Sequence, residues 1–170
     1  MSSSAIRVLG VDTSLRSSGV AVVEGRGSRL VAMEHDRIRN PSSKSLVQSL
    51  GHIDDVIRGI VERVQPDAIA VEGIFYCKNV RTAVSLGEAR GVVIAAGARA
   101  GLPVFEYAPR RVKQAVVGNG AASKVQVRRM VMSLLALTEE PQEDAGDALA
   151  IAICHINNHT SHAALAPKQL

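Results

Sequence analysis

Aromatic residues and cysteines are scarce in this chain of 170 residues. Only 2% of the residues are aromatic, with no Trp, two Tyr and two Phe. The two cysteines, Cys77 and Cys154, lie far apart in the sequence, which argues against a disulfide framework or a cysteine-based zinc site. A chain with so few cysteines fits a reducing compartment, so we expect the protein in the cytoplasm.

Long apolar runs are also absent. None reaches the roughly 18 residues that a membrane-spanning helix needs, so we expect no membrane partner. The opening stretch "MSSSAIRVLGVD" has no apolar segment ahead of a cleavage site, and we expect no secretory signal. Hydrophobic residues make up 46% of the chain and charged residues 21%, which is typical of a folded globular protein. We predict one domain over residues 1–159 and a flexible C-terminal tail over residues 160–170.

Acidic residues are missing from residues 107–138, although the same segment is rich in basic ones. The basic side chains are Arg110, Arg111, Lys113, Lys124, Arg128 and Arg129. A short charge run is usually a solvated helix face. Because acids are wholly absent over this length, we favour a role in binding phosphates. The net charge of +4 and the pI of about 9.4 are compatible with a polyanionic partner.

Five short apolar segments have the pattern of strands: residues 5–13, 19–25, 29–38, 68–75 and 103–108. Short links join the first three, which favours an antiparallel meander. A helix capped by Ser42 or Ser43 precedes the fourth strand, which we therefore expect to lie parallel to the first. With a helix over residues 80–98 and two or three more near the end, we predict an α/β fold. This fold has a mixed five-stranded sheet with helices on both faces.

Four acidic residues stand where such a fold would bring them together. Asp12 and Glu72 each end an apolar strand, and Asp144 and Asp147 share one face of the helix predicted within residues 139–156. Carboxylates in close quarters raise each other's pKa unless a cation is present, and Mg²⁺ prefers such hard oxygen ligands. Two ions about 3.5–4 Å apart would activate a water and stabilise the leaving oxygen in phosphodiester hydrolysis.

Three of the four acids taken alone have an ordinary structural explanation, whereas Asp147 is harder to explain in this way because it lies one turn further into the apolar helix. Asp144 suits the positive end of a helix dipole, and for that residue alone we prefer this interpretation. Asp12 could support a turn through its neighbour Thr13, and Glu72 could simply be exposed at a strand end. Only the combination of acids favours a metal site.

Aromatic and basic residues follow Glu72 directly in "GIFYCKNVRT". Phe75 with Lys78 and Arg81 would combine stacking surface and charge, as single-stranded or distorted nucleic acid requires. From the residues alone, a core position for Phe75 is the better interpretation. Further along, His155 could face the acids, but we expect a core histidine. Small residues between positions 89 and 97 predict a close helix contact, either internal or between two copies.

Three stretches resemble the RuvC family of bacterial Holliday-junction resolvases, members of the RNase H-like superfamily. They are "AIAVEGIFYCKNVRTAVSLGEARGV", "PVFEYAPRRVKQAVVGNGAASKVQV" and "PQEDAGDALAIAICH", and the resemblance extends to about His159. It implies an Mg²⁺-dependent homodimer, with Mn²⁺ able to substitute. Such an enzyme nicks two opposed strands of a four-way DNA junction symmetrically in recombination and repair. It also implies the RuvA–RuvB branch-migration complex as a partner.

The same resemblance assigns roles to particular residues. The four acids Asp12, Glu72, Asp144 and Asp147 match the catalytic acids of the family. Lys113 and Lys124 match basic residues close to the scissile phosphate, and Phe75 matches an aromatic that stacks on an unpaired base at the junction centre.

One departure concerns the turn after Asp12. Thr13 and Ser14 replace the Pro-Gly pair that is usual in the family, and Val20 with Ala21 replaces an aromatic position. This departure is the only support for a non-catalytic junction-binding protein. A related RNase H-like nuclease acting on RNA is a second alternative. "GVDTS" also resembles the phosphate loop of sugar kinases and actin-like ATPases, but the chain is too short for the second lobe that those proteins need.

Overall fold

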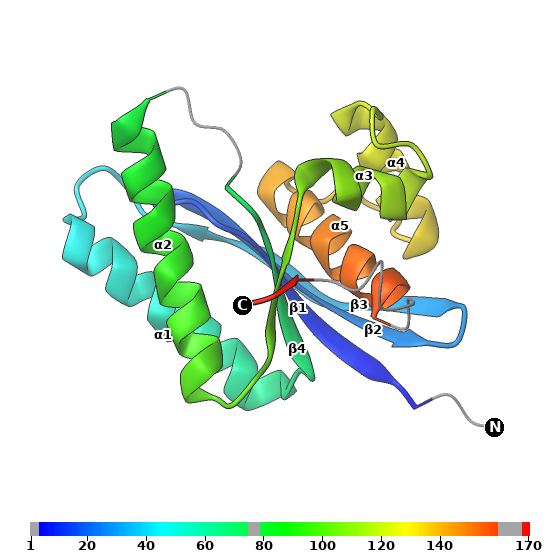
Figure 1. Ribbon diagram of the computed structural model, residues 1–170, viewed down its shortest axis with the longest axis horizontal. Helices are drawn as coiled ribbons and strands as arrows, with labels where there is room; N and C mark the ends of the chain where they lie inside the picture. Colours follow the sequence, from blue (N-terminus) through cyan, green and yellow to red (C-terminus); the bar gives the residue numbers. More distant parts are fainter. Residues whose placement is uncertain (1–3, 75–78, 160–167) are drawn as a thin grey trace.

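The chain folds into three layers, with a central sheet and helices packed on each of its faces (Figure 1). The computed structural model describes residues 4–74, 79–159 and 168–170. The strands are β1 Ile6–Asp12, β2 Ser17–Arg26, β3 Arg29–Arg39, β4 Ala68–Glu72, β5 Val104–Tyr107 and β6 Lys168–Gln169. The helices are α1 Leu46–Val64, α2 Val80–Arg99, α3 Pro109–Val117, α4 Lys124–Leu134 and α5 Glu143–Asn158. In this part of the chain, no helix has the length and apolar character needed to cross a membrane.

The sheet confirms the predicted mixed topology with one correction. Its strand order is β3-β2-β1-β4-β5-β6, in which β1, β2 and β3 form the antiparallel meander and β4 runs parallel to β1. The prediction of five strands was wrong, because β6 pairs antiparallel with β5 and makes a sixth. The two residues of β6 lie in the segment expected to be a flexible tail. They are both polar and exposed, so no apolar pattern marked them as a strand.

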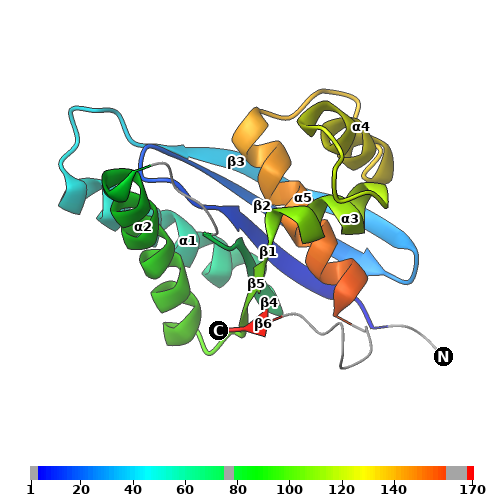
Figure 2. The ribbon, with the colours of Figure 1, turned by 45° about the horizontal axis from the view of Figure 1, so that its top comes forward.

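Helices cover the two faces of the sheet in separate groups, as Figures 1 and 2 show from two directions. On one face α1 and α2 bury a core that includes Leu9, and on the other α3, α4 and α5 bury a core that includes Val8. Because successive strand side chains point to opposite faces, a strand covered on both sides needs apolar residues throughout. This explains the continuous apolar run in β1.

Helix α1 is capped by a serine slightly later in the sequence than the two that were predicted. Its N-cap is Ser45, whose hydroxyl accepts a hydrogen bond from the N–H of Gln48, while the Gln48 side chain accepts one from the Ser45 N–H. Neither Ser42 nor Ser43 is the cap, because only Ser45 has a glutamine three residues later to complete this reciprocal pair. The helix ends at Gln65, which adopts a left-handed conformation ahead of Pro66.

Helix α5 lies directly on the backbone of the sheet. A Cβ atom at Gly10 would come within 2.2 Å of the Ala148 carbonyl oxygen, and one at Gly19 within 1.8 Å of the Asp144 carbonyl oxygen. Both glycines are therefore required by the close approach of strand and helix. Nearly all of α5 is buried, although Asp144 and Asp147 near its N-terminus are only partly so.

Candidate active site

The ends of two parallel strands place Asp12 beside Glu72. β1 and β4 pair in parallel register, with Val11 opposite Val71, so the next residue of each strand emerges at the same edge of the sheet. Both residues are partly buried, in contrast to the fully buried valines before them. The expectation that these two acids are neighbours is confirmed by this strand pairing.

Helix α5 adds a third acid to the same place. Asp12, Glu72 and Asp147 line a cavity of about 310 Å³ together with Lys113 from α3 and Lys124 from α4. Its remaining lining residues are Pro109, Val112, Val127, Ala150 and Ile151. We call this space the acid cavity. Its lining therefore contains carboxylates, ammonium groups and apolar side chains. The cavity thus combines possible metal ligands with possible phosphate contacts.

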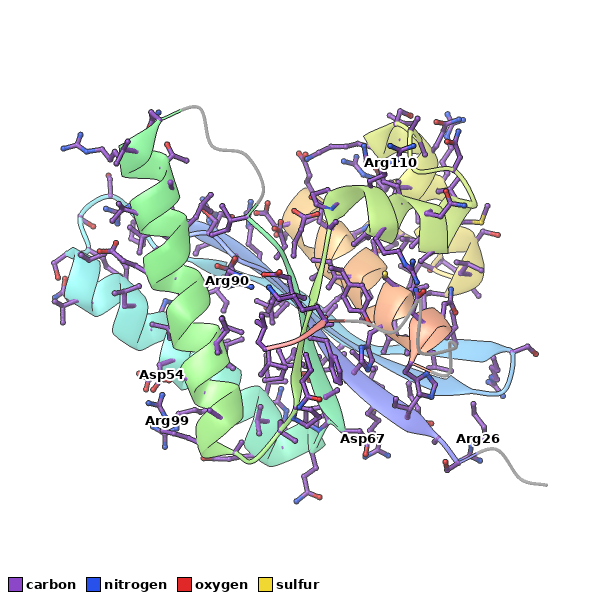
Figure 3. The ribbon with its side chains drawn as sticks, viewed as in Figure 1. Arg26, Asp54, Asp67, Arg90, Arg99 and Arg110 are labelled. Carbon is purple, nitrogen blue, oxygen red and sulfur yellow. The ribbon has the colours of Figure 1, made fainter. Side chains whose placement is uncertain are left out.

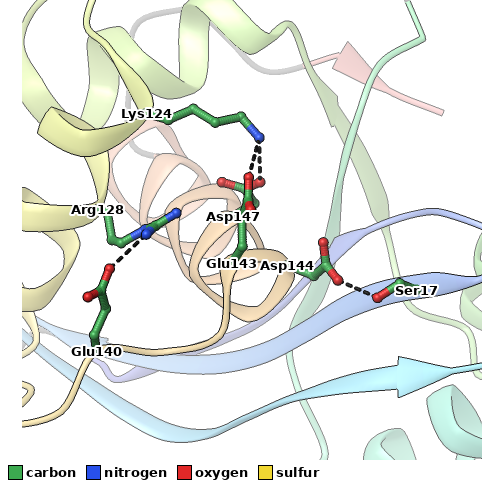
Figure 4. A network of polar contacts seen from close by, with 7 residues as sticks. All are labelled: Ser17, Lys124, Arg128, Glu140, Glu143, Asp144 and Asp147. Carbon is green, nitrogen blue, oxygen red and sulfur yellow. Dashed lines mark hydrogen bonds and ion pairs between the residues drawn. The ribbon is translucent and has the colours of Figure 1, made fainter.

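Asp144 lies one helical turn before Asp147 and faces a different neighbour. Its Oδ2 atom accepts a hydrogen bond from the hydroxyl of Ser17, the first residue of β2 (Figure 4). Asp144 does not line the acid cavity, but its charge still raises the pKa of Asp12. The fourth predicted acid is therefore adjacent to the other three. Sequence reasoning missed Ser17, because a serine at the start of a strand gives no signal of this contact.

The acids carry more negative charge than their surroundings compensate. The pKa of Asp12 rises from 3.8 to about 7, first because the group is buried and then because Asp147, Glu72 and Asp144 repel its charge. Burial and the charge of Asp147 raise the pKa of Glu72, against the opposing effect of Lys124 and Lys113. Burial also raises the pKa of Asp147. Such mutual repulsion is relieved by protonation or by a bound cation.

Lys124 is the cavity lysine that forms ion pairs with the acids of α5. Its Nζ atom lies 2.9 Å from Glu143 Oε1 and 3.6 Å from Asp147 Oδ2 (Figure 4). The hydrogen bond to Glu143 and the charge of Asp147 raise the pKa of Lys124, so the group stays protonated. Glu143 was not predicted as part of the site, although its spacing of four residues from Asp147 places both on one helix face.

A ready-made set of metal ligands is not found within the described ranges, where no three His, Cys, Asp or Glu side chains are grouped closely enough to hold an ion. The contacts of α5 account for this arrangement, since Asp144 faces Ser17 and Asp147 faces Lys124. The donor set nevertheless suits a hard divalent cation, because it consists of carboxylates with uncompensated charge. The residues that could hold such an ion are Asp12, Glu72, Asp144 and Asp147.

Several residues of the acid-free basic run have acidic or polar partners in space. Arg128 pairs with Glu140 at 2.7 Å, and the guanidinium of Arg111 donates to Asn158 Oδ1. These partners belong to α5 and to the segment that leads into it. The absence of acids along the sequence therefore does not give an acid-free surface, and the phosphate contacts of this run remain a prediction.

The predicted DNA contacts after Glu72 are only partly visible. Phe75 and Lys78 lie outside the described residues. Arg81 is exposed in the first turn of α2 and is not among the residues that line the acid cavity.

His155 is a core residue, as expected. Its Nδ1 atom is 2.8 Å from the hydroxyl of Tyr107, and burial lowers its pKa to about 4. Tyr107 also pairs with Glu72 across β5 and β4. The contact between Tyr107 and His155 therefore connects the C-terminal part of α5 to the strand pair that carries Glu72.

The turn after Asp12 lacks the Pro-Gly pair but is hydrogen-bonded to buried side chains. The buried hydroxyl of Ser18 accepts a hydrogen bond from the Ser14 N–H at 2.9 Å and donates to the Ser14 carbonyl. The buried side chain of Asn40 donates to the Leu15 carbonyl at 3.0 Å. Side chains from β2 and from the end of β3 thus fix this turn.

Known proteins resemble the chain in both sequence and fold. The sequence profile of the family described as "Crossover junction endodeoxyribonuclease RuvC" matches residues 8–155. The crossover junction endodeoxyribonuclease RuvC of Trichlorobacter lovleyi is 47% identical over 154 residues, which cover 91% of this chain and 86% of the relative. The RuvC of Geotalea uraniireducens is 47% identical over 153 residues, which cover 90% of each. The solved structure of T. thermophilus RuvC in complex with a Holliday junction substrate has a TM-score of 0.90 and 31% identity, covering 97% of this chain and 99% of that one.

Proposed function

The chain belongs to the RuvC family of crossover junction endodeoxyribonucleases, and we propose that the acid cavity is its active site. It is an endonuclease that resolves four-way DNA junctions. The observation that carries the assignment of the site is the convergence of Asp12, Glu72 and Asp147 with two lysines at one end of the sheet.

The proposed catalytic acids are Asp12, Glu72, Asp144 and Asp147, and we assign Mg²⁺ as the cofactor, with two ions per site and Mn²⁺ as a substitute. The raised pKa of Asp12 supports a cation, because like charges at this end of the sheet lack full compensation. Bound Mg²⁺ would supply a more acidic water as nucleophile and would stabilise charge on the leaving oxygen.

Lys113 and Lys124 would hold the phosphate beside these acids. Both line the acid cavity and both lower the pKa of Glu72, so their charges act within it. A phosphate drawn to Lys124 would compete with Asp147 and Glu143 for the ammonium group. We retain Phe75 as a proposed contact with the opened junction on the family resemblance, and Lys78 and Arg81 on the charge that they place next to it in the sequence.

We further propose a homodimer that forms through a groove between α1 and α2. The groove has a volume of about 510 Å³ and is lined by Val47, Leu50, Gly51, Asp54, Glu88, Gly91, Val92, Ala95 and Arg99. Apolar and small side chains form most of it, and Asp54 and Arg99, which also line it, pair with each other (Figure 3). A surface that carries both charge signs can match a second copy of itself about a two-fold axis. Two copies would supply the two sites that paired symmetric nicks require.

The small residues of α2 support this surface in part. Ala89, Ala96 and Gly97 are buried within the chain, and a Cβ atom at Gly97 would come within 2.6 Å of Val104. Gly91 and Ala95 line the groove instead, and a Cβ atom at Gly91 would meet open space. The first group is therefore internal, and its closest approach, at Gly97, is to a strand and not to a helix. A close helix–helix contact between two copies remains a proposal for the second group.

Family membership also leads us to propose the RuvA–RuvB branch-migration complex as a partner and the cytoplasm as the location. We retain one nuclease domain over residues 1–159 as a proposal. Lys168 and Gln169 belong to β6, so the prediction of a flexible tail was wrong for these two residues, and residues 160–167 lie outside the described part of the chain.

The deciding experiment is cleavage of a labelled four-way DNA junction with Mg²⁺, beside a linear duplex of matched sequence. We expect paired symmetric nicks in the junction alone, lost in Glu72→Gln and in Asp147→Asn while junction binding persists. Tight binding without nicks under Mg²⁺ or Mn²⁺ would favour the non-catalytic junction-binding protein. Preferred cleavage of RNA would favour the related nuclease, and full activity of either variant would remove that acid from the site.

A further inference from the structure

Ser17 and Gly19 make two contacts with a single residue of α5. The Ser17 hydroxyl donates a hydrogen bond to Asp144 Oδ2, and a Cβ atom at Gly19 would overlap the Asp144 carbonyl oxygen. The start of β2 thus meets Asp144 at its side chain, as Figure 4 shows, and at its backbone. Gly19 also pairs with Asp12 across β2 and β1, so this contact relates Asp144 directly to the acid that ends β1.

The position of Ser17 is itself fixed by the turn that precedes it. Ser18 is fully buried and closes the turn onto Ser14 through its hydroxyl. The N–H of Asn40 donates to the Arg16 carbonyl at 2.9 Å, and the Arg16 guanidinium donates to the Pro41 carbonyl at 3.1 Å. These contacts hold the backbone on both sides of Ser17. The Ser17 hydroxyl can therefore restrain the Asp144 carboxylate, because the backbone that carries it has little freedom to move.

From these contacts we propose that Ser17 is a positioning residue that fixes the Asp144 carboxylate for metal binding. A carboxylate on a short side chain can rotate about its last torsion, and that torsion is broad. With Oδ2 bonded to Ser17, the plane of the group is set and Oδ1 is the oxygen offered to a metal. Hydrogen-bonded partners of metal ligands orient them in this way, and their loss commonly weakens metal affinity about 10–100-fold. This inference rests on the proposed role of Asp144 as a metal ligand.

The test compares Ser17→Thr with Ser17→Val, two variants of nearly the same shape that differ in the hydroxyl. Binding of Mn²⁺ to the full chain is followed by electron paramagnetic resonance in the absence of DNA. We expect Ser17→Thr to bind Mn²⁺ as the wild type does, and Ser17→Val to bind about tenfold more weakly. The Mg²⁺ concentration for half-maximal junction cleavage should rise in Ser17→Val alone, with the rate recovering at saturating Mg²⁺.

Ser14→Ala is the matched control in the same turn, because the Ser14 backbone rather than its hydroxyl bonds to Ser18. It should bind Mn²⁺ like the wild type. Equal Mn²⁺ affinity of Ser17→Val and Ser17→Thr would overturn the positioning role if Asp144→Asn still weakens binding. Unchanged binding in Asp144→Asn would overturn the ligand role of Asp144 and the positioning role with it. Equal weakening in both Ser17 variants would show that shape matters and not the hydroxyl, which also overturns the inference.

Discussion

The ammonium group of Lys124 lies 3.6 Å from the Asp147 carboxylate, so the two side chains form an ion pair. Each of them is also proposed to bind another group during catalysis. Asp147 is proposed to bind a metal, and Lys124 is proposed to bind a phosphate. In the absence of both, the two side chains partly neutralise each other, because Lys124 lowers the pKa of Asp147. A metal bound to Asp147 would therefore release Lys124 for the phosphate, and a phosphate bound to Lys124 would release Asp147 for the metal.

Glu143→Gln should strengthen junction binding, because it removes the acid nearest to Lys124, at 2.9 Å. The ion pair is exposed and therefore weak, so we expect a gain of roughly two- to fivefold at low salt that fades as salt rises. Fluorescence anisotropy of a labelled junction in EDTA would measure it. Glu62→Gln, which removes an acid near Arg58 on α1, is the control and should change nothing. Weaker binding by Glu143→Gln would mean that Glu143 orients Lys124 for DNA.

Asp12 should make the metal-free protein less stable as pH rises from about 4 to 7. The folded chain holds the Asp12 proton up to its raised pKa of about 7, whereas the unfolded chain loses it near 3.8. Through this group the folded state binds more protons across the window, so the Asp12 contribution to the free energy of unfolding decreases with pH. His155, whose folded pKa is lowered to about 4, acts in the opposite sense below about pH 6.5, so the test is the difference between the wild type and Asp12→Asn. Urea unfolding in EDTA should show this difference change by roughly 2–4 kcal/mol between pH 5 and pH 8.

Asp12→Asn should lose this contribution and be more stable than the wild type above pH 7. Glu72 and Asp147 still act in the same sense as Asp12, since the pKa of each is also raised, and His155 acts in the opposite sense. Mg²⁺ added above pH 7 should restore stability to the wild type. Parallel curves for the two proteins in EDTA would contradict the raised pKa of Asp12.

Gly19→Ala should lose both stability and cleavage. Its new methyl group would overlap the Asp144 carbonyl, and overpacking of this kind costs about 1–3 kcal/mol. A shift of α5 by about 1 Å could reduce cleavage on the order of 100-fold. Gly87→Ala on the exposed face of α2 is the control, because a Cβ atom there meets nothing and should stabilise the helix by about 0.5–1 kcal/mol. Urea unfolding and single-turnover cleavage would measure both effects, and a fully active Gly19→Ala would contradict the close packing of α5.

Gly91→Glu should break the proposed dimer, because it places a carboxylate in the groove between α1 and α2. We expect sedimentation as a monomer and unpaired nicks in place of paired ones. Val31→Glu, at an exposed apolar position on β3, is the control and should stay dimeric. A dimer that survives Gly91→Glu would place the contact between copies elsewhere.

The sequence predicted those parts of the site that depend on apolar runs. Asp12 and Glu72 could be placed together because each ends a strand whose uninterrupted apolar residues indicate burial on both faces. Asp147 could be added because the helix that follows it is apolar on every side. The parallel pairing of β1 with β4 then confirmed the first step of this reasoning.

Contacts between polar groups from distant segments could not be predicted in this way. Nothing in the pattern of residues relates Ser17 to Asp144 or brings Glu140 beside Arg128. Such contacts depend on the direction of single side chains after the backbone has packed. The N-cap of α1 shows a smaller failure of the same kind, since several serines compete and only the side chain of Gln48 selects Ser45.

The acids of α5 come late in the chain, and this order has a consequence for synthesis. Asp12 leaves the ribosome early with the first strand, but Asp144 and Asp147 follow more than a hundred residues later. Until α5 arrives, one face of the β1–β3 meander lacks its apolar cover. A nascent chain thus carries an exposed apolar surface and an incomplete set of acids at the same time. Nuclease activity and a closed core should therefore both appear only after α5 has been synthesised, so an unfinished chain should not cut DNA.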